Sequence, residues 1–111
     1  VLFETALAQA REYDFVELIA RAATNLALVN IQRQDYDRAA ALLDEAADIT
    51  RRLDMRRWLA SAIRAQSQLK AAQGEQEAAE KLWEEAARNY NMLRMPQGKQ
   101  QPAWLKPDMK A

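Results

Sequence analysis

Arginine is the residue type that is most concentrated where it could bind a ligand. Arg51, Arg52, Arg56 and Arg57 lie within seven residues, on either side of the turn LDM. Guanidinium groups form paired hydrogen bonds with phosphate and carboxylate, so this cluster could hold an acidic partner. Positive charge is also favoured at a helix C-terminus, where Arg51 and Arg52 are expected. Because no aromatic residues interleave with the arginines, we do not expect nucleic-acid binding.

The carboxylates form no recognisable catalytic set. Glu80, Glu84 and Glu85 follow the spacing of an exposed helix face, and Glu77 precedes Lys81 by four residues, where an ion pair stabilises a helix. The sequence contains no cysteine and no histidine. These absences exclude disulfides and a cysteine nucleophile, and they remove the commonest zinc ligands and the commonest general base. We therefore predict that the chain is not an enzyme and binds no metal or cofactor.

The composition indicates one helical domain. A chain of 111 residues can bury one core but is too short for two ordinary domains. Half of the residues are apolar, and many of these are alanine, the strongest helix former. The three prolines are Pro96, Pro102 and Pro107, so residues 1–95 contain no proline break. Sixteen acidic residues balance sixteen basic ones, and partners must therefore be selected by shape and local charge.

The expected location of the protein follows from what the sequence lacks. No apolar run approaches the roughly 18 residues needed to span a bilayer, so we predict no membrane contact. The sequence begins at Val1 with neither an initiator methionine nor a secretion signal, and we expect the natural N-terminus to lie upstream. The lack of cysteine fits a cytoplasmic protein.

A repeat becomes visible when the sequence is shifted against itself by 40 positions. The segment LLDEAA at 42–47 then aligns with LWEEAA at 82–87, and Ala39 aligns with Ala79. The same shift in the other direction places LFETA at 2–6 against the first of these segments. Three copies of one helix and two copies of its preceding partner are therefore expected.

Apolar residues recur at helical spacing and divide the chain into five helices. Asp14, Asp35 and Asp54 stand where the second, third and fourth helices begin and are expected to cap them. Gly74 is expected to end a helix in a left-handed conformation. The predicted helices span about residues 1–12, 14–34, 35–53, 55–73 and 75–94.

The C-terminal residues 96–111 cannot continue the last helix because they contain three prolines and a glycine. Two arrangements remain open. The tail is mobile, or Trp104 and Leu105 fold back on the last helix and cap it. Trp83 replaces a leucine of the preceding copy and is expected in the core, whereas Trp58 and Trp104 either anchor a partner or pack between units.

The residues around the turns carry a resemblance to a known family. The first unit has a regular set of small and large apolar residues at Leu26, Ala27, Tyr36, Ala39, Leu43 and Ala46. The second unit repeats part of the set at Gly74, Ala79, Trp83 and Ala86. This pattern resembles the tetratricopeptide repeats, although Gln66 and Gln76 stand where that family prefers apolar or aromatic residues. Ser67 keeps the small site small.

The repeat length narrows the resemblance. A period of 40 residues, instead of the usual 34, is similar to the extended subgroup found in kinesin light chains and in bacterial peptide-sensing regulators. HEAT and armadillo repeats would also fit a period of this length, but they lack the turn pattern.

The resemblance implies an all-α fold in which antiparallel helix pairs stack as a right-handed solenoid, with a groove lined by the first helix of each pair. It implies groove-facing positions at Arg21, Thr24, Asn25, Leu28, Gln32, Ser61, Arg64 and Gln68, with Ala65 and Ala72 beside them. Asn25 would hydrogen-bond a peptide backbone, because an amide both donates and accepts. Arg21 and Arg64 would bind a carboxylate. In the second unit Ala65 replaces Asn25, so no continuous row of asparagines is present.

The implied function is that of a protein–protein interaction scaffold, which binds a peptide or a partner protein in this groove. Two alternatives remain open. The chain is a regulatory or sensor module of a larger bacterial signalling or transcription protein, or it is a structural module that forms homo-oligomers through Leu2, Phe3 or the C-terminal tail. For Asn25 and the groove arginines, the simplest alternative is a solvated helix surface without a ligand.

Overall fold

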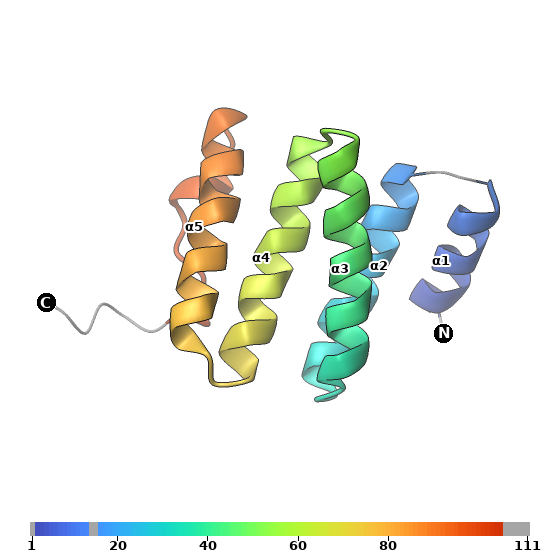
Figure 1. Cartoon of the computed structure of the whole chain (residues 1–111), viewed down its shortest axis with the longest axis horizontal. Helices are drawn as coiled ribbons and strands as arrows, with labels where there is room; N and C mark the ends of the chain where they lie inside the picture. Colours follow the sequence, from blue (N-terminus) through green and yellow to red (C-terminus); the bar gives the residue numbers. More distant parts are fainter. Residues whose placement is uncertain (1, 14–15, 106–111) are drawn as a thin grey trace, which may run out of the picture.

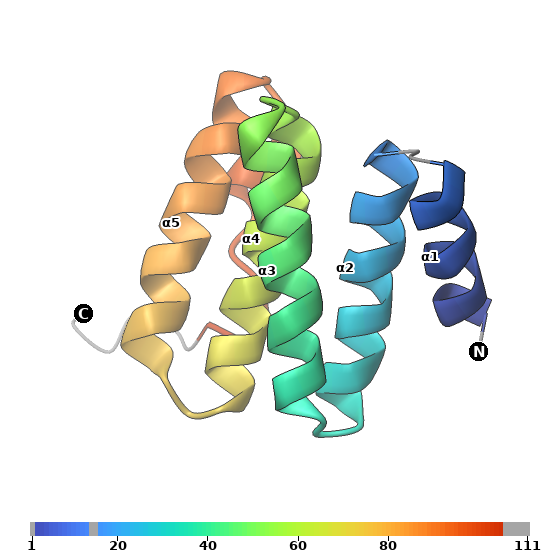
Figure 2. The same cartoon turned by 45° about the vertical axis from the view of Figure 1, so that its right-hand side comes forward.

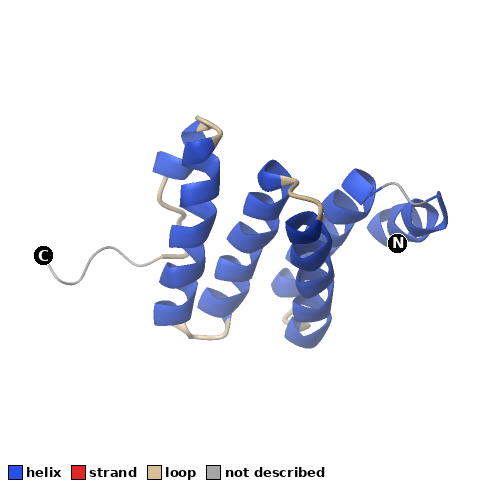
Figure 3. Ribbon diagram, turned by 45° about the horizontal axis from the view of Figure 1, so that its top comes forward, coloured by secondary structure: helices blue, strands red, loops and turns tan. Residues whose placement is uncertain are grey.

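The chain folds as a row of five α-helices followed by one short 3-10 turn (Figures 1 and 3). The structure, a computed structural model, describes residues 2–13 and 16–105. The elements are α1 (Leu2–Tyr13), α2 (Val16–Gln32), α3 (Tyr36–Arg52), α4 (Arg56–Ala72), α5 (Gln76–Met92) and η1 (Pro96–Lys99). No strand occurs among the described residues, and the prediction of an all-helical fold with five helices is confirmed.

Each helix packs against the helix that follows it in the chain, and α2 also packs against α4. Figure 1 shows α1 and α5 at opposite ends of the molecule, with α2, α3 and α4 between them. Short turns join α2 to α3, α3 to α4 and α4 to α5, so neighbouring helices run in opposite directions. Because α2 and α4 are also in contact, they place their outward-facing residues next to each other.

The 40-residue period consists of two 20-residue units that share one turn geometry. Helices α2 to α5 each have 17 residues. The turns place a left-handed residue at Gln34, Asp54, Gly74 and Arg94, with φ of 62°, 54°, 82° and 56°. In each turn, the amide of the next residue donates to the carbonyl five residues before it, as in the bond of 2.8 Å from Asp35 to Asn30. This is the Schellman motif, and the expected left-handed Gly74 is confirmed.

The expected aspartate caps are corrected by the structure. Asp35 precedes α3, but its side chain makes no capping hydrogen bond. Its ψ is 72°, whereas a capping side chain is aimed at the helix amides by an extended backbone. Asp54 lies within the turn at positive φ, and Met55 takes the position before α4. Asp14 lies outside the described residues.

Small residues set the spacing of the core. Ala39, Ala46, Ala79 and Ala86 are completely buried, and so is Leu43. Since backbones approach most closely where side chains are smallest, these alanines allow α3 and α5 to lie against the preceding helices. Trp83, expected within the core, is only partly buried and packs against the edge of the main apolar cluster.

Candidate functional site

A stripe of outward-facing side chains follows α2. Arg21, Asn25 and Gln32 are exposed and Leu28 is half-buried. Their spacing of four, three and four residues keeps them on one face of the helix. Thr24, which was expected in the same set, is only 9% exposed and lies beneath this surface. The stripe therefore offers one cation, one apolar side chain and two amides.

Trp58 of α4 extends this stripe onto the next first helix. The guanidinium carbon of Arg21 lies 5.3 Å from the centre of the Trp58 ring, and that of Arg57 lies 4.9 Å from it. Stacking of a cation on an exposed indole contributes about 0.5–1 kcal/mol. Arg21 is also 4.0 Å from Glu17, an exposed contact that adds little. Arg21 and Trp58 therefore join α2 and α4 at one end of the face.

The predicted residues of α4 have a different environment from those of α2. The Ser61 hydroxyl lies 3.2 Å from the Tyr90 hydroxyl of α5. The Arg64 guanidinium lies 4.7 Å from the centre of the Trp104 ring, and Gln68 is half-buried. Ser61 and Arg64 thus contact α5 and the C-terminal segment. The structure divides the predicted groove set into an exposed part on α2 and a covered part on α4.

The C-terminal segment covers that part of α4. After η1 the backbone is extended at Gln100, and the chain returns along α4 and α5 (Figure 2). Pro102 and Leu105 are buried. Gly98 makes this close approach possible, because a Cβ atom there would lie 2.9 Å from the Ala87 carbonyl oxygen of α5. Any side chain at position 98 would push the segment away from α5.

Trp104 is held by three side chains of α4 and α5. Its indole nitrogen donates to the Ser67 hydroxyl over 2.9 Å, and Arg64 covers its ring. Gln76 donates its amide nitrogen to the Trp104 carbonyl oxygen over 3.3 Å. The Ser67 hydroxyl in turn donates to the Ala79 carbonyl oxygen over 2.7 Å. One hydroxyl therefore connects α4, α5 and the C-terminal segment.

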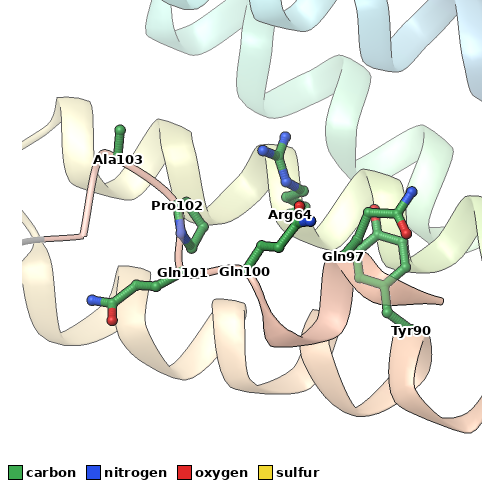
Figure 4. A pocket seen from close by; sticks show the side chains of 7 residues that line it. All are labelled: Arg64, Tyr90, Gln97, Gln100, Gln101, Pro102 and Ala103. Atoms are coloured by element: carbon green, nitrogen blue, oxygen red, sulfur yellow. The ribbon is translucent and has the colours of Figure 1, made fainter. Parts of the chain in front are cut away.

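A pocket of about 400 Å³ lies between this segment and the two helices (Figure 4). Its lining consists of Arg64, Tyr90, Gln97, Gln100, Gln101, Pro102 and Ala103. Amide groups predominate, and the Gln97 side-chain oxygen is buried without a hydrogen-bond partner. The segment thus encloses a polar space between itself and α4.

The arginine cluster is largely neutralised within the molecule. Arg51 pairs with Glu85 at 3.1 Å, Arg52 with Asp48 at 3.2 Å, and Arg56 with Asp54 at 3.7 Å. The fourth member, Arg57, stacks on Trp58. Paired guanidinium groups have less capacity to bind phosphate, because a ligand would have to displace the carboxylates.

The remaining charges also serve the helices. Glu77 and Lys81 form the expected pair, at 3.6 Å. Within residues 2–13 and 16–105, no three metal-ligating side chains come together. None of the helices described has the length and apolar character required to cross a bilayer.

Comparison with protein-family models, with curated proteins and with solved structures finds no match for this chain. The function is therefore inferred from the geometry of the α2 and α4 faces and of the C-terminal segment. Sequence reasoning identified Trp58 and Trp104 as candidate contacts but did not identify Ser67 and Gln76 as their partners. The available signal was that both residues depart from the first repeat at equivalent positions.

Proposed function

We propose that this chain is a protein–protein interaction scaffold that binds an extended peptide across the exposed face of α2 and the adjacent end of α4. The observation that carries the proposal is the stripe of Arg21, Asn25 and Leu28 on α2, continued by Trp58 of α4. In the proposed arrangement, the helix pairs belong to a right-handed solenoid of the tetratricopeptide type. Its first helices form the binding groove.

Each residue of the stripe has a defined part in the proposed binding. The Asn25 amide would donate to and accept from the peptide backbone. Arg21 would bind a carboxylate through paired hydrogen bonds, and Trp58 and Leu28 would bury apolar side chains of the peptide. Helices held by tertiary packing lose little conformational entropy on binding, so most of the ordering cost falls on the peptide.

Selection from a random peptide display library against the full chain tests this proposal. Enriched peptides should bind Arg21→Ala about 10- to 100-fold more weakly, the range expected for loss of a hydrogen bond to a charged group of about 1.5–3 kcal/mol. Asn25→Ala should weaken binding by about 3- to 10-fold. Arg52→Ala is the matched control, since Arg52 is an exposed arginine on α3.

Isothermal titration of the selected peptides gives the affinities, and circular dichroism gives the melting temperature of each variant. The melting temperatures should be unchanged, because Arg21 and Asn25 are exposed. A library that yields no binder would contradict the proposal. So would peptides that bind Arg21→Ala and Asn25→Ala as tightly as they bind the unaltered chain.

A further inference from the structure

The second repeat differs from the first at three positions that all contact Trp104. Thr24 and Ala27 of α2 correspond, 40 residues later, to Arg64 and Ser67 of α4, and Tyr36 corresponds to Gln76. Arg64 stacks on the Trp104 ring, while Ser67 and Gln76 hydrogen-bond to it. Residues that weaken the repeat pattern are therefore the ones that hold the C-terminal segment.

Each of these three differences supplies an interaction that the first repeat cannot make. Ala27 has no acceptor for an indole N–H, whereas the Ser67 hydroxyl accepts this bond while donating to Ala79. Gln76 supplies an amide donor to the Trp104 carbonyl oxygen, and Arg64 supplies a planar cation to its ring. Together they recognise the indole N–H, the aromatic face and the backbone of one tryptophan.

Gln66, another departure from the repeat, makes a different contact. It corresponds to Leu26, and its amide nitrogen lies 3.5 Å from a carboxylate oxygen of Asp44 on α3. General loss of the repeat pattern would scatter polar substitutions over the unit. Here the substitutions at 64, 67 and 76 meet at one residue of the C-terminal segment.

We propose that the slot between α4 and α5 is a peptide-recognition site for an extended segment of the form Pro-x-Trp-Leu. The chain's own residues 102–105 occupy it, and a partner segment of the same chemistry competes with them. This inference rests on the proposed function, because it names a second peptide site and its ligand class. It uses none of the α2 residues on which that function depends.

The residues that flank Trp104 complete the recognition. Pro102 and Leu105 are buried, and the Leu105 amide donates to the Pro102 carbonyl oxygen over 3.2 Å. A proline restricts the unbound segment, which reduces the entropy lost when it docks. A segment attached by a short connection acts at an effective concentration in the millimolar range, so an external peptide meets a strong competitor.

Substitution of Trp104 in the full chain opens the slot for a test. Trp104→Ala should bind a fluorescent peptide with the sequence of residues 100–105, QQPAWL, at least 10-fold more tightly than the unaltered chain does. Fluorescence anisotropy measures this affinity. The control peptide carries Trp104→Phe, which keeps an aromatic ring but removes the N–H donor.

A double-mutant cycle then isolates the bond to Ser67. In the Trp104→Ala chain, Ser67→Ala should weaken binding of QQPAWL by about 3- to 10-fold, the loss expected for one hydrogen bond. The same substitution should leave the affinity for the phenylalanine peptide unchanged. Asn25→Ala should affect neither peptide, so this test succeeds or fails independently of the α2 face.

The proposal is overturned if Trp104→Ala binds QQPAWL no better than the unaltered chain, or if the phenylalanine peptide binds equally well. It is also overturned if the unaltered chain is a dimer that Trp104→Ala converts to a monomer, because the segment would then be exchanged between two copies.

A measurement that leaves Trp104 in place covers the case in which Trp104→Ala does not fold. In the otherwise unaltered chain, the Trp104 indole N–H should be protected from solvent exchange, and Ser67→Ala should remove that protection. The indole resonance can be assigned with Trp104→Phe. Unchanged protection in Ser67→Ala would contradict the proposed slot.

Discussion

Alanine determines how closely the helices approach, and Ala39 is the clearest case. It is completely buried in α3, in a cluster that includes Ala27 and Ile31 of α2 and Leu69 of α4. A larger side chain at this position has no space unless α3 moves away from α2. The same need for small residues explains why the repeat keeps alanine at position 79.

We expect Ala39→Leu to lower the free energy of unfolding by about 1–3 kcal/mol, because three extra carbon atoms must be accommodated in a packed interface. Ala41→Leu makes the same chemical change at an exposed position of the same helix and should alter stability by less than about 0.5 kcal/mol. Urea denaturation followed by circular dichroism measures both. Equal stability of the two variants would contradict the packing described for α3.

At the scale of elements, the turns are more regular than their sequences. Four turns, spaced 20 residues apart, place a residue at positive φ, yet only Gly74 is a glycine. The other three positions carry Gln34, Asp54 and Arg94, whose Cβ atoms make this conformation costly by about 1–2 kcal/mol each. The helices therefore impose the turn geometry, even where the local sequence does not favour it.

Exchange of glycine at two of these turns should have opposite effects. Gln34→Gly should raise the free energy of unfolding by about 0.5–1 kcal/mol, since the relief of strain exceeds the entropy cost of glycine. Gly74→Ala should lower it by about 1 kcal/mol. A Cβ atom at Gly74 meets nothing within 4 Å, so steric contact would not contribute.

Thermal denaturation of the two single variants and of the double variant provides the measurement. The two changes lie in different turns, so their effects should be additive. Destabilisation by Gln34→Gly would show that the Gln34 side chain, and not its backbone conformation, determines stability at that turn.

At the scale of the whole molecule, one apolar cluster draws residues from all five helices. It extends from Leu7 of α1 to Tyr90 of α5 and includes Ile63 of α4, which is completely buried. Ion pairs also connect helices that are not consecutive, as Arg51 of α3 does with Glu85 of α5. These pairs are partly exposed, whereas the cluster is shielded from water, so burial should dominate stability.

We expect Ile63→Ala to lower the free energy of unfolding by about 2–5 kcal/mol, because it removes buried methyl groups and leaves a cavity. Glu85→Gln should cost less than about 1 kcal/mol. Circular dichroism and tryptophan fluorescence should report a single coincident transition, since the cluster joins the helices into one unit. Two separate transitions would show that α1 and α2 unfold independently of α4 and α5.

The sequence by itself determined where the helices lie and how they repeat. Helical periodicity depends on neighbours three and four residues apart, so it is legible without knowledge of the fold. Helices α2 to α5 accordingly end within about two residues of the expected positions. Gly74 was identified in the same way, because its conformational preference is a property of the residue itself.

Only the tertiary structure decided what the outward faces contact. Arg64 and Ser67 were assigned to an open groove and to a small packing site, and the tail was left either mobile or capping. The structure brings both residues to Trp104, which is 37 positions away from Ser67 in the sequence. A proline-containing segment has no periodicity that indicates its partner. Its position is determined by complementarity between side chains that are distant in the sequence, and this complementarity exists only once α4 and α5 have packed.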